Sequence, residues 1–175
     1  MVFHETKIAG VFEIRMEPRF DERGFFARTW CRDEFRLHGL NPRLEQCNLS
    51  FNARQGTLRG LHYQVAPYAE AKLIRCTSGA IYDVVVDLRP DSSTFKDWLG
   101  FGLTAGNRLM VYVPEGCAHG FLTLEPESEV FYQMSETYNE NSARGVRWND
   151  PAFRIIWPQN VEVLSPRDQS YPDFD

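Results

Sequence analysis

The sequence predicts a single, mainly antiparallel all-β domain with a few short helices. Short β-branched and aromatic runs alternate with clusters of turn residues at intervals of about 8 to 15 residues, the spacing typical of a β-sandwich or barrel. Only one short stretch has helical character. The length of 175 residues fits a single domain that covers 1–175. We therefore expect a jelly-roll or cupin-like β-barrel.

The expected strands are apolar runs that end at turn residues. The clearest is 79–92, a β-branched run that Gly79 opens and Pro90 closes. The stretch 32–38 is the expected helix, and it is short because it holds too few apolar residues for a long amphipathic face. In chain order, the expected strands are 11–17, 56–64, 71–79, 79–92, 108–114 and 129–138.

The composition indicates a globular protein that acts on small molecules. Apolar residues make up 43% of the chain, and the formal net charge of −5 is spread along it. There is no basic patch for nucleic acid and no acidic tail for a partner protein. The first residues do not resemble a signal peptide, and no apolar run approaches the roughly 18 residues of a membrane span. We expect a cytoplasmic protein with no membrane or nucleic-acid partner.

The four cysteines are too widely spaced for a zinc site or a disulfide framework. No two of them form a CxxC pair. We expect all four to be reduced and buried, as free cysteines usually are. They are Cys31, Cys47, Cys76 and Cys117.

The strand expected at 56–64 carries an arginine and a histidine. Strict alternation would place Arg59 and His62 on opposite faces of the sheet. Gly60 lies between them and permits a β-bulge, which could turn both side chains inward. A histidine in a strand is more often structural than catalytic, so at this point both readings stay open for His62.

A second histidine, His119, follows a turn that is expected to deliver it onto a further strand, and this turn resembles the second half of the cupin metal motif, PxGxxH. The first half of that motif supplies HxH followed by a glutamate. Here the equivalent positions are His62 and Gln64, with Glu70 further on. Gln64 is a poor substitute for a histidine ligand, and two histidines alone rarely hold a catalytic metal. We expect no metal.

Five more polar residues are candidates for chemistry. Lys72 begins a strand, where lysines are usually solvated. Asp83 lies in an apolar run, where a carboxylate needs a cationic or hydrogen-bonding partner. Tyr132 and Tyr138 are core residues or proton donors. The purpose of Asp168, near the C-terminus, stays open at this point.

Together, these segments resemble the 3,5-epimerases of dTDP-4-dehydro-6-deoxyglucose, the enzyme class of the dTDP-rhamnose pathway. The resemblance covers nearly the whole chain in order, and RGLHYQ followed by AHGF is its most specific part. The matching segments are DERGFF (21–26), QCNLS (46–50), GTLRGLHYQ (56–64), KL (72–73), GAIYDV (79–84), DLR (87–89), PEGCAHGF (114–121), WNDP (148–151), IWP (156–158) and LS (164–165).

The resemblance implies an epimerase that needs no cofactor and no metal. By this resemblance His62 is the general base, and Asp168 is the carboxylate that orients it. Lys72 stabilises the enolate that forms when a proton leaves carbon 3 or carbon 5, next to the carbon 4 ketone. Tyr132 returns a proton from the opposite face of the sugar and so inverts the centre.

The resemblance also implies a nucleotide-diphosphate-sugar substrate and a homodimer. Arginine suits the diphosphate because its planar fork binds phosphate through two hydrogen bonds. The N-terminal strands are expected to be exchanged across the dimer, so that Arg23 and Phe26 serve the neighbouring subunit's site. The implied substrate-binding residues are Arg23, Phe26, Gln46, Asn48, Arg59, His119 and Tyr138.

Three departures from the family pattern concern the nucleotide side. Arg28 and Ala143 stand where the family usually has glutamates, and one extra residue lies between Asn48 and Gly56. These changes lead to the hypothesis that the chemistry is kept while the sugar nucleotide differs from the dTDP form.

Three alternatives remain. One is an epimerase that acts at carbon 3 alone or carbon 5 alone, which sequence does not separate from a 3,5-epimerase. Another is a metal-dependent cupin oxygenase or isomerase. The third is a cupin that binds a sugar nucleotide without turning it over.

Overall fold

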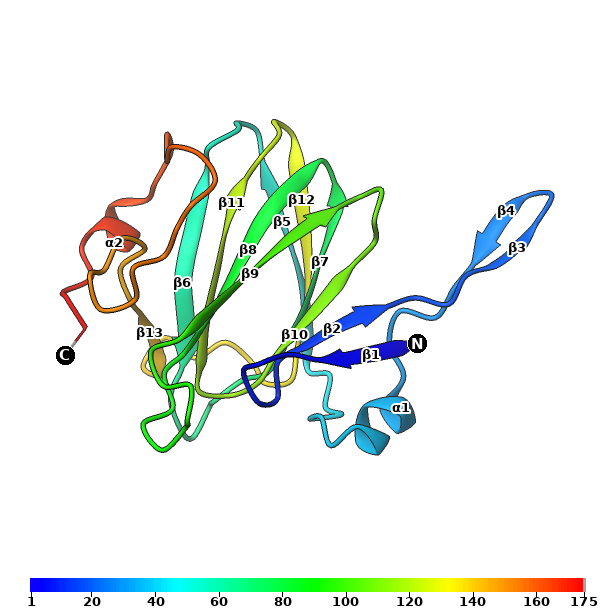
Figure 1. Ribbon diagram of the computed structural model, residues 1–175, viewed down its shortest axis with the longest axis horizontal. Helices are drawn as coiled ribbons and strands as arrows, with labels where there is room; N and C mark the ends of the chain where they lie inside the picture. Colours follow the sequence, from blue (N-terminus) through cyan, green and yellow to red (C-terminus); the bar gives the residue numbers. More distant parts are fainter. Residues whose placement is uncertain (175) are drawn as a thin grey trace.

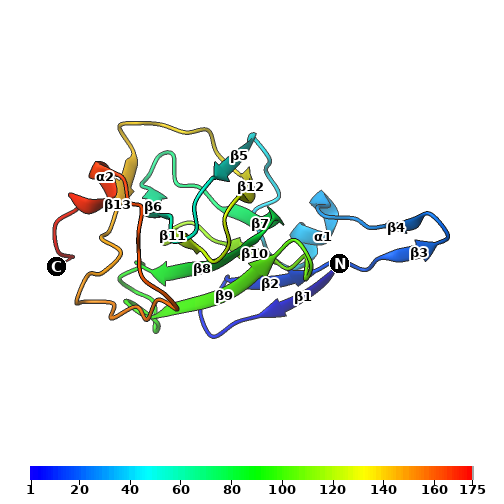
Figure 2. The ribbon, with the colours of Figure 1, turned by 90° about the horizontal axis from the view of Figure 1, so that it is seen from above.

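The computed structural model describes residues 1–174 and consists mainly of two antiparallel β-sheets packed face to face (Figures 1 and 2). The first sheet has the strand order β1-β2-β10-β7-β12-β5, and the second has the order β13-β6-β11-β8-β9. This architecture confirms the predicted all-β, cupin-like fold with few helices.

The bounds of the elements follow. The first sheet contains β1 Val2–Glu5, β2 Phe12–Arg15, β5 Gln46–Asn52, β7 Lys72–Ser78, β10 Met110–Val113 and β12 Ser128–Met134. The second contains β6 Leu58–Gln64, β8 Ala80–Asp87, β9 Trp98–Thr104, β11 Cys117–Thr123 and β13 Ala143–Gly145. The remaining elements are the two-stranded hairpin of β3 Arg19–Asp21 and β4 Gly24–Phe26, and the helices α1 Arg32–Leu37 and α2 Pro166–Gln169.

The core between the sheets is built from one face of each strand. On β8, Ile81 and Val85 are fully buried in this core, together with Val130 of β12 and Phe121 of β11. Each such aliphatic side chain contributes about 1.5–3 kcal/mol when it is removed from water. The core fills part of the interior, and the remainder is open to a pocket.

A second apolar layer covers the outer face of the five-stranded sheet. Val84 and Val86 alternate with the inward residues of β8 and pack with Leu61 and Phe153. Trp157 and Phe174 of the C-terminal segment lie against this layer. The C-terminal segment is therefore held along the sheet, and α2 lies beside β6 (Figure 1).

Strand β6 contains the β-bulge that the glycine predicts. His62 pairs with His119, and Arg59 pairs with Phe121, so β6 has one more residue than β11 between these two pairs. Gly60, in the bulge, has φ +127°. A Cβ there would lie 2.5 Å from the Cα of Gly120. The bulge therefore depends on glycine, both for its backbone conformation and for the close approach of β11.

The β3–β4 hairpin projects away from the body of the molecule (Figures 1 and 2). Its side chains are exposed, including Phe20 at 75% and Phe26 at 78%. Two large aromatic side chains in water on one hairpin are unusual for a monomer, because such exposure forgoes the free energy of burial.

The expected strands and the expected helix are all present, with ends shifted by a few residues. The elements that were not predicted are β1, β3, β4, β5, β9, β13 and α2. The expectation of buried thiols is wrong for Cys47, which is exposed on β5, and only in part right for the half-buried Cys31. Among the helices of residues 1–174, none has the length and apolarity that crossing a membrane requires.

Candidate active site

A pocket of about 320 Å³ opens between the two sheets. Both sheets contribute to its wall, and the strands whose side chains line it are β5, β6, β7, β11 and β12. Of the candidates from the sequence, the pocket is lined by Asn48, Arg59, His62, Lys72, His119, Tyr132 and Tyr138. The bulge in β6 explains how both Arg59 and His62 reach it.

His62 and Asp168 form a close pair at the pocket. His62 Nε2 lies 2.7 Å from Asp168 Oδ1, and Oδ2 accepts a hydrogen bond from the Gly60 backbone N–H at 3.3 Å. Burial disfavours the Asp168 carboxylate, but the hydrogen bonds and charge of its partners outweigh that cost, so the pKa of Asp168 is lowered. An ionised carboxylate only accepts hydrogen bonds, which places a proton on His62 Nε2 and leaves Nδ1 free to take one.

Helix α2 places Asp168 in this position. The Ser165 side chain caps α2 and accepts a hydrogen bond from the Asp168 backbone N–H at 3.1 Å. Pro166 occupies the first turn, where its missing N–H has no cost. Asp168, whose purpose was open from the sequence, is therefore the hydrogen-bond partner of His62, 106 residues earlier in the chain.

Lys72 lies at the pocket with its side chain 7% exposed. Its Nζ is 3.0 Å from Glu70 Oε1 and donates a hydrogen bond to the His62 backbone oxygen at 3.1 Å. A buried ammonium group needs such partners. Lysines at strand ends are usually solvated, but Lys72 is buried because β7 begins inside the barrel.

Tyr132 on β12 and His119 on β11 come from opposite sheets and meet in the pocket. Their rings meet edge to face, with centroids 6.1 Å apart. Burial raises the pKa of the Tyr132 hydroxyl, and the nearby Asp83 charge raises it further. Tyr132 is therefore protonated at neutral pH and can donate a proton but does not act as a base.

Asp83 has the partner that its burial requires. His119 Nε2 lies 2.6 Å from Asp83 Oδ2, while Asp83 Oδ1 has no hydrogen-bond partner among residues 1–174. Burial raises the pKa of Asp83, and the charges of His119 and Lys72 reduce the shift. The predicted need for a cationic or donor partner is confirmed.

Arg59, Gln46 and Tyr138 lie toward the pocket mouth. Arg59 Nε donates to Asn52 Oδ1 at 2.7 Å, which fixes the guanidinium at the end of β5. The Tyr138 backbone N–H donates to Gln46 Oε1 at 3.0 Å, so Gln46 lies beside the tyrosine without lining the pocket itself. Tyr138 is 56% exposed, which leaves an aromatic face available to a ligand.

Arg23 and Phe26 do not join the pocket within one chain. Both lie on the projecting hairpin, where Arg23 pairs with Asp21 at 2.5 Å. Arg28 follows the hairpin and pairs with Glu34 of α1 at 2.6 Å. Ala143, another of the three departures, does line the pocket.

Sequence reasoning missed several residues of the wall. They include Arg144 and Arg167, which add two cations to the pocket lining. Arg167 Nε donates to the Tyr171 hydroxyl at 3.0 Å, which holds it beside the mouth. Its position directly before Asp168 was the available signal. Other lining residues that were not singled out are Leu49, Ser50, Tyr63, Phe121 and Met134, and Glu70 was named only as a position of the cupin motif.

No group of three or more histidine, cysteine, aspartate or glutamate side chains within residues 1–174 has the arrangement of a metal site. At the cupin motif, Gln64 points its amide to protein partners: its Nε2 donates toward Glu70 Oε2 at 3.1 Å and its Oε1 accepts from the Asn139 N–H at 2.6 Å. The residues present therefore do not form the usual ligand set.

The fold and the pocket together define a cupin-type barrel equipped for acid–base chemistry on an anionic small molecule. A histidine paired with a carboxylate, a buried ammonium and a protonated tyrosine face one cavity, and arginines lie around it. This is the set needed to remove a proton, stabilise the resulting anion and return a proton.

Comparison with known proteins identifies the family. Residues 5–175 match the family model described as dTDP-4-dehydrorhamnose 3,5-epimerase. The protein of that name from Sinorhizobium fredii is 40% identical over 99% of this chain and 90% of its own. A dTDP-4-dehydrorhamnose 3-epimerase from Streptomyces niveus is 42% identical over 93% of this chain and 78% of its own.

A solved structure agrees with both. The dTDP-4-dehydrorhamnose 3,5-epimerase from Bacillus anthracis, with TDP and PPi bound, superposes with a TM-score of 0.94 at 40% identity and covers 99% of each chain. The chain belongs to the dTDP-4-dehydrorhamnose 3,5-epimerase family, and the predicted family and enzyme class are confirmed.

Proposed function

We propose that this protein inverts carbon 3, carbon 5 or both in dTDP-4-dehydro-6-deoxyglucose, or a closely related 4-keto-6-deoxyhexose, through an enolate. Family membership supports the reaction class. The observation that carries the proposal is the His62–Asp168 pair at 2.7 Å, in one pocket with the ammonium of Lys72. The unit that performs the reaction is the whole chain, 1–175, as one epimerase domain.

His62 is the base in this proposal. The hydrogen bond from Nε2–H to Asp168 leaves Nδ1 to accept the proton from carbon 3 or carbon 5. The carboxylate then stabilises the imidazolium that forms. With 40% of its side chain exposed, His62 is accessible to a bound sugar.

Lys72 and Tyr132 complete the reaction. When the proton leaves carbon, negative charge develops on the oxygen at carbon 4, and the Lys72 ammonium stabilises it in a site largely shielded from water. Tyr132 is kept protonated by burial and gives its proton to the carbanion carbon from the other face. Abstraction on one face and delivery on the other invert the centre.

The remaining residues hold the nucleotide part and the sugar. Arg59, Arg144 and Arg167 line the pocket and suit a diphosphate. Asn48 and Gln46 offer amide donors, His119 contacts the sugar, and the exposed ring of Tyr138 stacks on a base or sugar. The Bacillus anthracis relative was solved with TDP and PPi bound, which supports a nucleotide diphosphate at this site.

Proton exchange in deuterated water tests the reaction. The protein is incubated with dTDP-4-keto-6-deoxyglucose in D₂O, and the sugar is followed by NMR. We expect deuterium at carbons 3 and 5, with loss of exchange in His62→Ala. Exchange at the parental rate in His62→Ala would remove the base assignment. No exchange with the parent protein would refute an epimerase acting on this substrate.

A single-centre epimerase is the second candidate, since the Streptomyces niveus relative is a 3-epimerase. The same experiment separates the two, because deuterium then enters at carbon 3 alone.

The nucleotide preference is tested by comparing dTDP, CDP and GDP forms of the 4-keto-6-deoxy sugar. The relatives' names support dTDP, whereas Ala143 in the pocket and Arg28 next to the hairpin supported a change of nucleotide. A preference for dTDP alone ends the hypothesis of divergence. A preference that Ala143→Glu shifts back toward dTDP assigns the divergence to that position.

We propose further that the protein is a homodimer in which the hairpin of one chain reaches the pocket of the other. The exposed Phe20 and Phe26 of the hairpin support this, as do Leu49 and Phe51, which are 59% and 56% exposed on β5. β5 is the end strand of its sheet, so a partner chain has an open edge beside the pocket. In this arrangement Arg23 and Phe26 act on the neighbouring site.

Complementation tests the exchange. His62→Ala and Phe26→Ala are each expected to be poorly active, and the two chains are co-expressed. A heterodimer then holds one intact site and one doubly defective site, so random pairing restores about a quarter of the sites. No gain of activity over the single variants, or a monomer in sedimentation, would refute the exchanged hairpin.

The predicted cytoplasmic location stays a prediction, which fractionation of cells checks.

A further inference from the structure

Glu70 is a buried carboxylate at the pocket that the proposed reaction does not use. The residue is 8% exposed and lies in the pocket wall. Oε1 is 3.0 Å from Lys72 Nζ, and Oε2 accepts a hydrogen bond from Gln64 Nε2 at 3.1 Å. Both oxygens therefore face donors, the arrangement that suits a group acting only as an acceptor.

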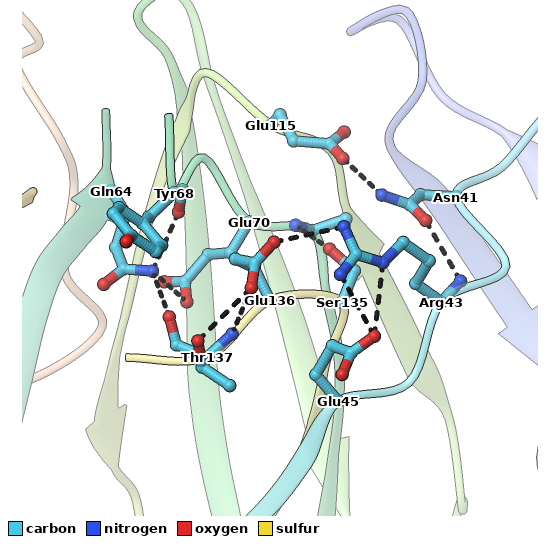
Figure 3. A network of polar contacts seen from close by, with 11 residues as sticks. Asn41, Arg43, Glu45, Gln64, Tyr68, Glu70, Glu115, Ser135, Glu136 and Thr137 are labelled. Atoms are coloured by element: carbon cyan, nitrogen blue, oxygen red, sulfur yellow. Dashed lines mark hydrogen bonds and ion pairs between the residues drawn. The ribbon is translucent and has the colours of Figure 1, made fainter. Parts of the chain in front are cut away.

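The neighbouring amide cannot turn round to suit a neutral partner. Gln64 Oε1 accepts from the Asn139 N–H at 2.6 Å, so Nε2 must point to the other side. There it meets three acceptors, the carbonyls of Tyr68 and Thr137 and the carboxylate of Glu70 (Figure 3). Gln64 is 3% exposed, and a flipped amide would leave its oxygen against these acceptors.

Through Gln64, Glu70 is tied to the loop that carries Tyr138. Thr137 and Asn139 flank that tyrosine, and both are hydrogen-bonded to the same amide. The chain of contacts runs from Lys72 through Glu70 and Gln64 to the pocket mouth. The ammonium position and the loop position are therefore set by one network.

The ammonium of Lys72 has two protein partners, Glu70 and the His62 carbonyl, so one of its three N–H bonds is left for a ligand. The charged and titratable groups that face it come from several strands. Asp83 of β8 acts on it electrostatically, and the pocket also contains His62 and Arg59 of β6, His119 of β11 and Tyr132 of β12. Among these, Glu70 is the carboxylate in direct contact.

We infer that Glu70 is a positioning residue, which keeps Lys72 charged and aimed at the substrate oxygen and couples it to the loop of Tyr138. The role of Lys72 in this inference rests on the proposed function. The structural part does not: without the carboxylate, the amine is more easily deprotonated at any given pH, since an adjacent negative charge favours the ammonium form.

Chemical labelling tests the structural part without turnover. The chain has three lysines, Lys7, Lys72 and Lys96, so acetylation by acetic anhydride can be followed at each by mass spectrometry. Only the neutral amine reacts, so the acetylation rate of a lysine reports the fraction of its side chain that is in the neutral form. In Glu70→Gln we expect Lys72 to react about tenfold faster than in the parent between pH 7 and pH 9, relative to the exposed Lys7.

Two further variants separate charge from loosened packing. Glu136→Gln removes one negative charge from the same neighbourhood (Figure 3), where Glu136 pairs with Arg43 and not with Lys72, and should leave Lys72 labelling unchanged. Glu70→Asp keeps the charge and should remain within about twofold of the parent. Equal labelling in Glu70→Gln and the parent would overturn the inference, and so would faster labelling in Glu70→Asp to the same degree as in Glu70→Gln.

The pH profile of deuterium exchange then tests the catalytic consequence. In Glu70→Gln the alkaline limb of kcat/KM should move about one pH unit lower, with a smaller change near pH 7. A uniform loss at all pH values with an unmoved limb would contradict the inference. If the parent protein exchanges no proton, the proposed function fails, and the labelling result alone decides whether Glu70 holds the charge of Lys72.

Discussion

The Asp168→Asn substitution is expected to disable the base while leaving the pocket in place. Asp168 accepts two hydrogen bonds, from His62 Nε2 and from the Gly60 N–H. An asparagine has one accepting and one donating end. If its oxygen keeps the Gly60 N–H, its NH₂ faces His62 Nε2 and selects the tautomer with the proton on Nδ1. The nitrogen that should take the substrate proton is then already protonated.

The size of the effect follows from these contacts. A hydrogen bond to a charged group contributes about 1.5–3 kcal/mol, which corresponds to about 10- to 150-fold in rate. The unfavourable tautomer adds to this, so we expect kcat/KM to fall by about 100-fold or more. Deuterium incorporation at carbons 3 and 5 measures it, and dTDP binding by calorimetry should change by less than about threefold.

Asp173→Asn is the matched control for this substitution. Asp173 is a carboxylate of the same C-terminal segment, 61% exposed and paired with Arg147 away from His62. Its substitution should leave exchange at the parental rate. Parental exchange in Asp168→Asn, or a loss of exchange that a parallel loss of dTDP binding and of folded protein accounts for, would refute the orienting role of Asp168.

Three further outcomes are expected. Tyr132→Phe should still exchange deuterium at carbon, because His62 can return a deuteron to the face from which it took the proton. Inversion of the carbon should fall by about 100-fold. NMR of the sugar separates exchange from inversion, and an equal loss of both would contradict a donor role for Tyr132. Gly60→Ala should lower the free energy of unfolding by at least about 2 kcal/mol more than Gly24→Ala. Both glycines have φ +127°, but only a Cβ at position 60 meets the facing backbone. Equal thermal shifts of the two variants would show that the close approach of β11 to Gly60 does not matter. Burial of Asp87 acts to raise its pKa, but the hydrogen bonds from Arg89, Ser92 and Thr94 outweigh burial, so the pKa of Asp87 is lowered on folding. The ionised Asp87 therefore stabilises the fold at pH values above its unfolded pKa near 3.8, and this stabilisation is lost as the pH falls below that value. Asp87→Asn should therefore cost about 3 kcal/mol at pH 7, and its thermal shift relative to the parent should shrink in acid; a shift that does not change with pH would contradict this account.

The fold could be predicted because its strands carry local signals. The run 79–92 has β-branched residues and turn residues at both ends, and it forms β8. Three of the strands that were not predicted, β3, β4 and β5, lack those signals. β5 is the end strand of its sheet and keeps four of its seven residues exposed, so its hydrophobic pattern is weak. β3 and β4 are fully exposed and have no hydrophobic pattern to find.

The pocket could be predicted in part, for a different reason. Gly60 between Arg59 and His62 signalled a bulge, and the structure has one. No local pattern joins His62 to Asp168, because 106 residues separate them; the expected pairing came from a family resemblance. Glu70 was noticed only as a misplaced metal ligand, since its partner Lys72 reads as solvated until β7 is placed inside the barrel.

The residues that a local interpretation misjudges share a physical property: each is stabilised by a contact that exists only in the folded chain. Asp83 in an apolar strand violates the usual pattern, and it is tolerated because β11 brings His119 to 2.6 Å. Lys72 is buried because Glu70 and the His62 carbonyl receive it. A charged residue that contradicts the apolar pattern of its strand therefore indicates that the fold supplies it with a polar partner. In this protein each of these partners lines the pocket or borders on it. That is why the violations of the β pattern lead to the active site more directly than the strands that obey it.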